Sequence, residues 1–386
     1  MKNYTVWHLH SDLSNGITNI DSVTKFDKYI NYAHELGMES IGFSEHGCIF
    51  SHIKKRQTCE KLGMKYLHGE EFYVTEKLVD DDGNKIKDNY HVVIIARNYD
   101  GYLELNKLST QAFNRATVKM VDDKERYYYS PRITFDELIS TSENLIITTA
   151  CLGGILNKGS DELQDRFVEF LTNNRCFLEV QHHIVPIQAE YNKKLLRISN
   201  ETGIRLIAGT DTHCLNKKHQ CGRAILQLSK NIKFDDESGW DLTFKTYNEL
   251  VDAYAKQGAL PEEIYLKAIE NTNVMADMVE MYRITNEYKY PHLWDDPIKE
   301  FKSRINKGYK KRKIATFENK QEYIDKIKYE TQTYINNGAV DFMLLMTDVI
   351  GFCEESGIEI GYGRGSVNGS VVAWDLGITE MDSLKY

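Results

Sequence analysis

The residues in this sequence with the clearest potential for chemistry are two histidines near its start, His8 and His10, separated by Leu9. In a strand, residues two apart point to the same face, so the two imidazoles would emerge side by side, about 7 Å apart along the chain. That arrangement suits two nitrogen ligands of one metal ion. A sequence with 12 histidines also produces such a pair by chance, so the positions of other candidate ligands matter.

Further imidazole, carboxylate and thiolate groups lie at or near other strand-like runs. They are His46, Glu71, His91, Cys151, Asp211 and His213. In parallel α/β folds and barrels, loops at one end of the strands converge on a rigid scaffold, so residues far apart in sequence meet in space. A mixed set of nitrogen, oxygen and sulfur ligands suits zinc, manganese or iron better than magnesium alone. Taken singly, each histidine could be a buried histidine hydrogen-bonded to a carboxylate, and the cysteine could be a small core residue. Taken together, the set favours a metal site.

The elements that would position these residues alternate between strand-like and helix-like segments up to about residue 235. The strand candidates are Tyr4–Leu9, Ser40–Phe43, Lys65–Val74, His91–Ala96, Leu145–Thr149, Cys176–Gln181 and Arg205–Ala208. Helix-like segments lie between them, among them Ile20–Leu36, Tyr102–Phe113, Leu163–Asn173 and Gln188–Glu201. This order indicates parallel strands covered by helices, in an open sheet or a barrel, and seven strands favour barrel-like closure. An Asp-Gly pair within 79–85 predicts a hairpin turn.

After about residue 235 the sequence becomes helix-rich and more acidic, which predicts two domains, 1–235 and 236–386. The chain has 48 Lys+Arg and 57 Asp+Glu, a formal net charge of −9, and residues 236–386 hold 18 of the basic and 26 of the acidic residues. This balance excludes nucleic-acid binding by the net charge of the whole chain, so any binding of DNA or RNA must depend on a local group of residues. A basic cluster at 307–313 predicts either a solvated helix face or a contact with a phosphate backbone.

The sequence predicts neither a membrane span nor a disulfide framework. No apolar run approaches the roughly 18 residues that a span needs, and the polar N-terminus is unlike a signal peptide. The seven cysteines are odd in number, widely spread and contain no C-x-x-C pair. We therefore expect a soluble, cytoplasmic chain with no membrane partner.

Taken as a series, these motifs resemble the PHP (polymerase and histidinol phosphatase) domain at the N-terminus of bacterial DNA polymerase III alpha subunits, which are C-family polymerases. The motifs are His8-Leu9-His10, Ser44-Glu45-His46-Gly47, the segment around Glu71, Tyr90-His91, Ala150-Cys151-Leu152-Gly153-Gly154 and Thr210-Asp211-Thr212-His213. The resemblance implies an α/β fold, a distorted (β/α)7 barrel with two to three divalent metals, zinc, manganese or iron. It also implies the metal ligands, at His8, His10, His46, Glu71, His91, Cys151, Asp211 and His213.

One ligand position departs from the family pattern. An aspartate usually follows the H-x-H segment, and the nearest counterpart here is Asn15, in a loop shorter than usual. An asparagine offers a neutral oxygen without charge, so a metal held at Asn15 would bind weakly; Asp12 is the alternative. We also assign catalytic roles to Asp12 and His183, as residues that orient the metal ligands.

A glycine-rich segment, Gly361-Tyr362-Gly363-Arg364-Gly365-Ser366, carries the second signature. Closely spaced glycines let backbone N–H groups approach a phosphate, although a plain helix-to-helix turn has the same composition. With the helical region 323–353, this segment resembles the palm of the same polymerases, which implies that Gly363, Arg364, Gly365 and Ser366 contact the phosphates of a deoxynucleotide triphosphate. Two-magnesium catalysis in that palm needs paired aspartates, and no suitable Asp-x-Asp occurs here. We therefore expect a helix-rich, incomplete palm that cannot polymerise DNA alone.

The leading hypothesis is the N-terminal part of a replicative polymerase whose PHP domain hydrolyses DNA 3′ ends as a metal-dependent exonuclease. Its partners would be a DNA primer-template and the remainder of the polymerase, on a separate or downstream polypeptide, with magnesium in the completed polymerase site. Two alternatives stay open. One is a catalytically inert, metal-stabilised scaffold that assembles with a separate polymerase polypeptide; the other is a stand-alone phosphatase for a small phosphoester, which would have no use for the glycine-rich segment.

Overall fold

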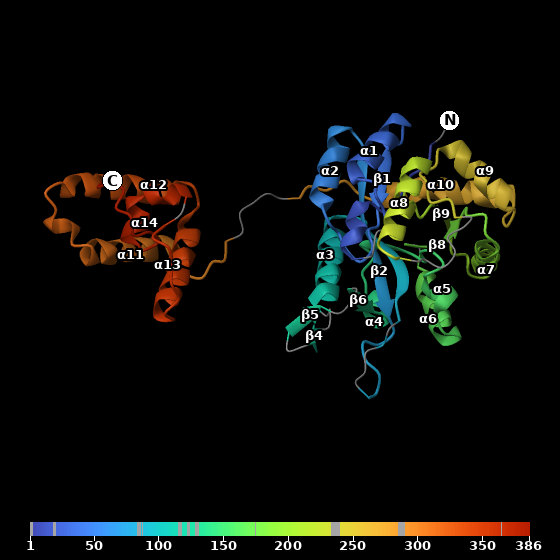
Figure 1. The fold of residues 1–386 in the computed structure, drawn as a ribbon, viewed down its shortest axis with the longest axis horizontal. Helices are drawn as coiled ribbons and strands as arrows, with labels where there is room; N and C mark the ends of the chain where they lie inside the picture. Colours follow the sequence, from blue (N-terminus) through green and yellow to red (C-terminus); the bar gives the residue numbers. More distant parts are fainter. Residues whose placement is uncertain are drawn as a thin grey trace. The chain divides into compact units, whose positions relative to one another are not determined.

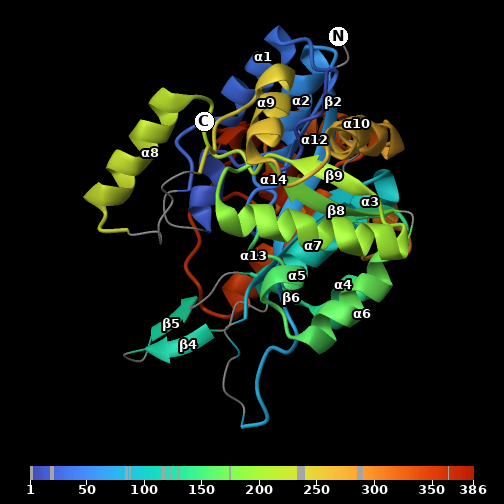
Figure 2. The ribbon, with the colours of Figure 1, turned by 90° about the vertical axis from the view of Figure 1, so that its right-hand side faces the viewer.

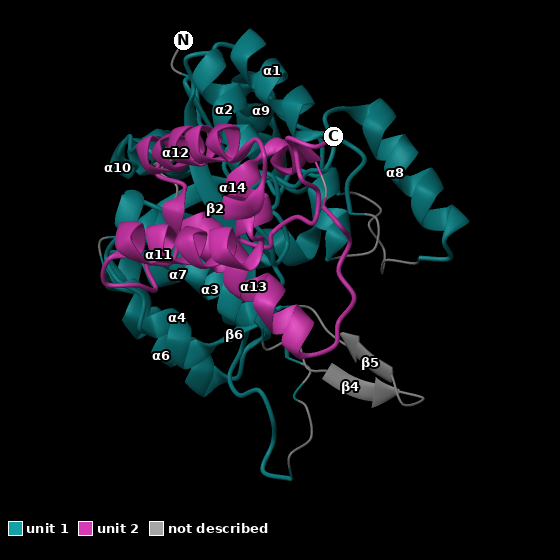
Figure 3. Ribbon diagram, turned by 90° about the vertical axis from the view of Figure 1, so that its left-hand side faces the viewer, with its two compact units in different colours: residues 1–284 teal, residues 285–386 magenta. Residues whose placement is uncertain are grey.

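The computed structural model describes residues 3–17, 21–82, 86, 88–114, 118–121, 124–127, 131–173, 175–232, 240–284, 290–363 and 365–386. The chain divides into two compact units, Met1–Ile284 and Thr285–Tyr386, which Figure 3 colours separately. Each unit has its own hydrophobic core, and each is described here by itself.

Unit 1 is an α/β domain built on one curled seven-stranded sheet (Figure 1). Its strands are β1 (Ser40–Phe43), β2 (Lys65–Thr75), β3 (Tyr90–Ala96), β6 (Arg132–Thr134), β7 (Leu145–Thr148), β8 (Cys176–Gln181) and β9 (Leu206–Gly209). The strand order is β1-β2-β3-β7-β8-β9, and β6 pairs with the last residues of β2. All residues of β1, β7, β8 and β9 are buried, as expected of strands covered on both faces.

The N-terminal segment links the two ends of this sheet. Val6 bridges Ile41 in β1, and Leu9 bridges Thr212 just after β9, both in parallel. The His10 N–H also donates to the Thr212 carbonyl oxygen at 2.8 Å. The predicted first strand is therefore a set of isolated bridges, and these bridges close the sheet into the distorted barrel that was expected.

The sheet is not parallel throughout, whereas the alternation of strands and helices in the sequence predicted parallel strands. The β2–β3 and β3–β7 pairs are antiparallel, while the β1–β2, β7–β8 and β8–β9 pairs are parallel. Parallel neighbours need a crossover, usually a helix, and the described residues between β2 and β3 contain none. β3 therefore returns beside β2 as in a hairpin. The predicted turn within 79–85 falls in this connection, but residues 83–85 lie outside the described part.

The helices of unit 1 cover its sheet, apart from α8 (Lys217–Ser229), which projects away from it (Figures 1 and 2). They are α1 (Phe26–Glu35), α2 (His52–Lys61), α3 (Tyr99–Asn114), α4 (Phe135–Ile139), α5 (Ile155–Lys158), α6 (Asp161–Leu171), α7 (Pro186–Thr202), α8 (Lys217–Ser229), α9 (Tyr247–Gln257) and α10 (Glu262–Met278), with the 3-10 helix η1 (Asp12–Gly16). A separate two-stranded sheet is formed by β4 (Val118–Val121) and β5 (Lys124–Tyr127). Local sequence sets the ends: α9 begins at a capping box of Thr246 and Glu249 and ends at Gly258, whose φ of +67° suits glycine.

Unit 1 ends at Ile284, whereas the sequence placed the domain boundary at residue 235. Helices α9 and α10 pack on the barrel: Leu250 and Ile269 belong to its main core. Met275 of α10 packs in a second cluster that contains Trp7 from the N-terminal segment. The composition shift after residue 235 therefore marks a change from strands to helices and not the end of the barrel's packing.

Unit 2 is helical throughout its described residues, as the sequence predicted. It contains α11 (Pro297–Lys311), α12 (Lys320–Asn336), α13 (Val340–Glu355) and α14 (Val371–Asp375), with the 3-10 helices η2 (Ile314–Thr316) and η3 (Gly365–Gly369). Its main core is formed by Phe301, Ile305, Val340, Met343, Leu344, Val372 and Ala373. Among the described helices of both units, none has the length and apolarity needed to cross a membrane.

Candidate metal centre

The two histidines of the H-x-H segment are buried and reach the same pair of carboxylates. His8 Nε2 lies 3.5 Å from Glu71 Oε1 and 3.4 Å from Asp211 Oδ1. His10 Nε2 lies 3.3 Å from Glu71 Oε2 and 3.3 Å from Asp211 Oδ1. Both imidazoles therefore face one polar cluster at the centre of unit 1.

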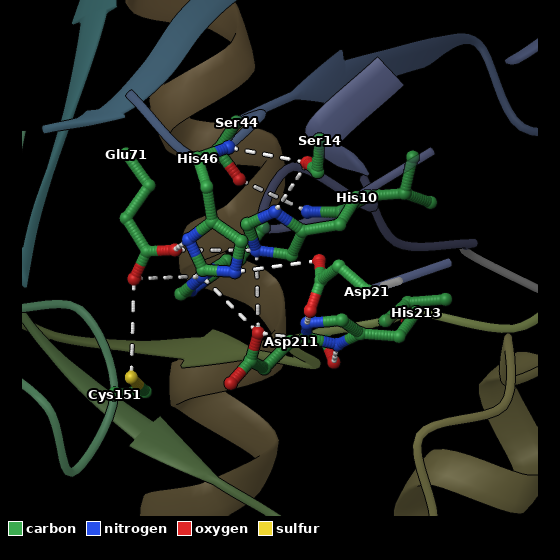
Figure 4. Close-up of polar contacts among 12 residues, drawn as sticks. His10, Ser14, Asp21, Ser44, His46, Glu71, Cys151, Asp211 and His213 are labelled. Atoms are coloured by element: carbon green, nitrogen blue, oxygen red, sulfur yellow. Dashed lines mark hydrogen bonds and ion pairs between the residues drawn. The ribbon is translucent and has the colours of Figure 1, made fainter. Parts of the chain in front are cut away.

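Candidate ligand atoms gather there in three overlapping groups, within each of which all atoms lie within 4.8 Å of one another. The groups are His10, Asp21, His46 and His213; His8, His10 and Asp211; and His46, Glu71 and His91. They share His10 and His46, so they form one continuous cluster. Figure 4 shows the labelled side chains of this cluster directed toward one another.

Barrel closure explains why these residues meet. His46 follows β1 and forms an isolated parallel bridge with Glu71 of β2. Asp211 and His213 follow β9, which lies at the other end of the sheet. The N-terminal segment joins β1 to the residues after β9 and places His10 between them. Asp211 has a φ of +45°, a left-handed conformation that is uncommon outside glycine and that concentrates at functional sites.

The donor set fits a metal ion. Within the described part of the chain, five buried polar atoms of the cluster lack a hydrogen-bond partner: His8 Nε2, His10 Nε2, Asp21 Oδ2, His46 Nδ1 and Glu71 Oε2. Buried polar groups are nearly always hydrogen-bonded, yet His46 Nδ1 faces Glu71 Oε2 at 2.8 Å without hydrogen-bond geometry. Divalent cations between these atoms would satisfy imidazole and carboxylate together.

Asp21, which the sequence reasoning missed, supplies the carboxylate that we expected Asn15 to replace. The Asp21 carboxylate lies 3.4 Å from His46 Nε2 and 3.2 Å from His213 Nε2. Asn15 belongs to none of the three groups. Its side chain instead accepts the Asp21 N–H at 2.6 Å and donates to the Ser22 carbonyl oxygen at 2.7 Å. Asn15 therefore lies outside the three groups, and its amide holds the loop that carries Asp21.

Cys151 lies at the Glu71 end of the cluster. Its Sγ is 3.5 Å from His91 Nδ1 and 3.8 Å from Glu71 Oε1, and His91 Nδ1 is 2.9 Å from the same carboxylate oxygen. Burial, followed by the Glu71 and Asp211 carboxylates, raises the pKa of the Cys151 thiol well above its ordinary value. A thiolate at this position therefore requires a cation beside it.

The charges of the cluster are strongly coupled. Burial, followed by the neighbouring His46 and His213, lowers the pKa of His10 to about 4. Burial alone would also lower the pKa of His46, but the Asp21 and Glu71 carboxylates outweigh it and raise that pKa to about 9. A cation that binds His46 must displace its proton, so metal binding here should release protons and weaken as the pH falls.

A carboxylate behind the cluster orients His8. Glu179, fully buried on β8, lies 2.6 Å from His8 Nδ1 and accepts a hydrogen bond of 2.7 Å from Gln181 Nε2. This contact leaves His8 Nε2 free to face the cluster, the arrangement in which carboxylates commonly fix metal-binding histidines. Gly209 leaves room for Glu179, because a Cβ at residue 209 would lie 1.9 Å from Glu179 Oε1. Glu179 lies within a strand and belongs to no recognisable motif, so the sequence gave no signal that it orients His8.

A buried ion pair supports the H-x-H segment from the other side. Lys55 Nζ lies 2.6 Å from Glu45 Oε1, and both side chains are almost completely buried. Glu45 also accepts hydrogen bonds from the Ser11 N–H at 2.9 Å and the Ser14 hydroxyl at 2.6 Å. The Ser14 oxygen in turn accepts the His46 N–H at 3.2 Å. The pair therefore fixes the loop between the ligands His10 and Asp21.

The two residues predicted to orient the ligands occupy different places. Asp12 is half-buried in η1, belongs to none of the three groups, and has Glu45 and Lys25 as its charged neighbours. His183 is fully buried, and neither of its ring nitrogens has a hydrogen-bond partner in the described residues. Burial lowers the pKa of His183 to about 4, and Asp211 acts on it electrostatically in the opposite direction. His183 is thus coupled electrostatically to Asp211 of the cluster, and Asp12 to Glu45, which supports the H-x-H segment.

The described residues of the glycine-rich segment are mostly exposed: residues 361–363 precede η3, and Gly365 and Ser366 are the first residues of η3. Gly363 has a φ of +142° and packs against Asn368, where a Cβ would lie 2.1 Å from Asn368 Oδ1. Gly365 has a φ of +73°, and Ser366 is exposed beside it. Arg364 lies outside the described residues.

Comparisons with known proteins relate the chain to polymerase subunits along its length. Two family profiles match: the PHP domain over residues 7–183, and the bacterial DNA polymerase III alpha NTPase domain over residues 299–386. The DNA polymerase III subunit alpha of Borreliella burgdorferi is 30% identical over 401 residues, covering 98% of this chain and 33% of the relative. That of Aquifex aeolicus is 28% identical over 422 residues, covering 100% of this chain and 34% of the relative. The chain thus spans about a third of the length of the curated relatives it matches.

Among solved structures, a protein described as a candidate metal-dependent phosphoesterase from Bifidobacterium adolescentis covers 54% of this chain and 87% of its own, with 16% identity and a TM-score of 0.37. The two profiles and the curated relatives, in contrast, agree on one family. Residues 7–183 therefore match the PHP domain and residues 299–386 match part of the bacterial DNA polymerase III alpha NTPase domain, and the chain as a whole is similar to the N-terminal segment of DNA polymerase III alpha subunits.

Proposed function

We propose that unit 1 is a metal-dependent phosphodiesterase that trims the 3′ end of a DNA primer. The observation that carries this proposal is the continuous, buried cluster of imidazoles and carboxylates, five of whose ligand atoms lack a hydrogen-bond partner among the described residues. A cluster of three overlapping groups can hold more than one cation, and multi-metal sites are the usual means of hydrolysing phosphodiesters.

The ligands in this proposal are the eight predicted residues together with Asp21. When bound, the divalent cations, zinc, manganese or iron, would supply Lewis-acid activation of water and of the scissile phosphate. The chain's own part is to hold and orient the ligands. Asp21, Glu71 and Asp211 contribute negative charge, and Glu179 fixes the ring of His8. His183 is buried and feels the charge of Asp211, and it is proposed as a positioning residue.

The inert-scaffold alternative depended on the loss of one carboxylate ligand at Asn15. Asp21 provides a carboxylate in that part of the cluster, so the donor set has no obvious gap. This favours hydrolysis over a purely structural metal site. The polymerase relationship favours a DNA end over a small phosphoester as the substrate, because the curated relatives are DNA polymerase subunits.

For unit 2, we propose that the turn at Gly363, Gly365 and Ser366, with Arg364, contacts the phosphates of a deoxynucleotide triphosphate in a completed, magnesium-dependent polymerase site. The exposure of this turn and the positive φ of Gly365 leave backbone groups accessible to a phosphate. Since the chain spans about a third of its relatives, polymerisation and the DNA primer-template belong in this proposal to the assembly with the rest of the polymerase.

The hydrolytic proposal is tested with a 3′-labelled, mismatched primer-template incubated with the purified chain and Mn²⁺ or Zn²⁺. We expect release of 3′ nucleotides by the wild type and at least a hundredfold loss in a double variant, His8→Ala with His10→Ala. His34→Ala, on the exposed face of α1, is the matched control and should keep full activity. Equal rates for the wild type and the double variant would overturn the proposal. Cleavage of a small phosphomonoester without DNA cleavage would favour the phosphatase alternative instead.

A further inference from the structure

Helix α13 of unit 2 is apolar on two opposite faces. One face packs into the core of unit 2 through Val340, Met343 and Leu344. The opposite face, which we name the α13 face, is formed by Phe342, Leu345, Met346, Val349, Phe352 and Cys353. These positions recur with the helical period, so they form one stripe along the helix. Three of them are largely exposed: Phe342 at 40%, Val349 at 46% and Phe352 at 63% of the full side-chain surface.

A helix that is apolar all round is typical of a buried helix, covered on every side. Single exposed apolar residues are ordinary on a protein surface, but a contiguous stripe marks an interaction site. Among the described residues of unit 2, Tyr290 packs against one end of the α13 face, with its ring centroid 5.5 Å from that of Phe342, whereas Val349 and Phe352 further along the helix stay exposed.

The extended segment after α13 continues this apolar surface. Ile358, Ile360 and Tyr362 alternate with polar or small residues and are exposed at 51%, 44% and 78%. Alternation with a period of two is the pattern of a strand. No strand occurs in the described part of unit 2, so the segment has no sheet partner there. The Ile358 N–H donates to the Cys353 carbonyl oxygen at 2.9 Å, which keeps the segment next to the end of the α13 face.

The lengths of the relatives identify what can cover this surface. Each curated relative extends over about three times the length of this chain, and the part outside the match has no counterpart in these 386 residues. We propose that the α13 face and the segment 358–362 form the docking surface for the remaining two thirds of a DNA polymerase III alpha subunit. The exposed strand-like segment fits an occupant that offers a sheet edge, since a strand adds to an open edge through main-chain hydrogen bonds. This inference rests on the proposed assembly with the rest of the polymerase and not on hydrolysis by unit 1.

The test uses the full chain and a separately purified polypeptide that comprises the remaining two thirds of a DNA polymerase III alpha subunit. Their binding is measured by isothermal titration calorimetry and by co-elution in size-exclusion chromatography. A double variant, Val349→Asp with Phe352→Asp, should raise Kd at least tenfold, which corresponds to about 1.4 kcal/mol. Glu355→Lys, exposed on the opposite side of the same helix, is the matched control and should change Kd less than twofold.

The side chains that change are exposed, so the double variant should keep the wild-type circular dichroism spectrum and the wild-type metal content. No complex with the wild type, or equal Kd for the wild type and the double variant, would overturn the proposal. Self-association of the wild type that the double variant abolishes would assign the face to a second copy of the chain and would also overturn it. Failure of DNA hydrolysis would leave these outcomes unchanged, because the readout is binding by unit 2.

Discussion

Replacing Lys55 with methionine should destabilise unit 1 by about 3 kcal/mol, because it leaves the buried Glu45 carboxylate without its counter-ion. Removing one partner of a buried ion pair typically costs about 3–5 kcal/mol. Glu45 keeps the hydrogen bonds from the Ser11 N–H and the Ser14 hydroxyl, so we expect the lower end of that range. Methionine preserves most of the apolar stem, which keeps cavity formation small.

The cost should depend on pH with a definite sign. Burial would raise the pKa of Glu45, but Lys55 and the hydroxyl donors prevail, so its pKa lies below the ordinary value of 4.5. A carboxylate with a depressed folded-state pKa contributes stability above its unfolded pKa and loses it as the pH falls through the folded one. The difference between the wild type and Lys55→Met should therefore be full at pH 7 and shrink below about pH 4.5.

Hydrogen exchange followed by mass spectrometry measures this effect in unit 1 alone, through peptides that cover β1 and β2. Lys54→Met, at an exposed position of the same helix, is the control and should change the free energy of unfolding by less than about 0.5 kcal/mol. Adding Glu45→Gln to Lys55→Met should cost less than the sum of the two single changes, because the charge left unpaired is gone. A loss below about 1 kcal/mol for Lys55→Met, or strict additivity in the double variant, would refute the role of this pair.

Three further changes probe other parts of the account. Asn15→Ala should weaken metal binding about tenfold in calorimetry, because the loop that presents Asp21 loses its hydrogen bonds with the Asn15 side chain. Unchanged affinity would show that the loop needs no such support. Gly209→Ala should displace Glu179 and lower metal affinity more than it lowers the melting temperature; the reverse order would contradict the positioning role. Burial raises the pKa of Asp375 to about 7, so its protonated form is favoured in the fold, and stability should fall as the pH rises from about 4 to 7. Asp375→Asn should then stabilise unit 2 by about 2 kcal/mol at pH 8 in hydrogen exchange and by nothing at pH 4, and equal effects at both pH values would refute this reading.

The sequence was most informative where a residue type and an element boundary coincide. The H-x-H pair, His46 after β1 and Asp211 after β9 could be placed in one cluster because strand ends converge in a closed sheet. The same reasoning did not require the N-terminal segment to be a regular strand. Its isolated bridges are sufficient, because only the positions of His8 and His10 relative to the neighbouring strands matter.

Asp21 was missed because its position depends on how the loop after η1 folds, and no periodicity governs a loop. Asn15 drew attention by its closeness in sequence to the H-x-H pair, yet its amide bonds to backbone groups of residues 21 and 22. One signal in the sequence could have pointed to Asp21. It is a carboxylate that follows the H-x-H segment and precedes the helix α1, so it was a candidate metal ligand.

Two features of the fold depend on tertiary packing and had no local signal. The antiparallel direction of β3 follows from the lack of a crossover helix in the described residues before it, which a strand pattern alone does not reveal. The packing of α9 and α10 on the barrel depends on which surface buries Leu250, Ile269 and Met275. Composition predicted these helices but carried no signal that they pack on the barrel.

The most direct test of the central claim is the metal content of the purified chain, measured by inductively coupled plasma mass spectrometry after loading with Mn²⁺ or Zn²⁺ and desalting. For a cluster of three overlapping groups, we predict about two to three equivalents in the wild type and about one fewer in Asp21→Asn. Asn15→Asp should match the wild type, since residue 15 lies outside the groups. Less than one equivalent in the wild type, or an unchanged content in Asp21→Asn, would contradict a multi-metal centre built on these residues.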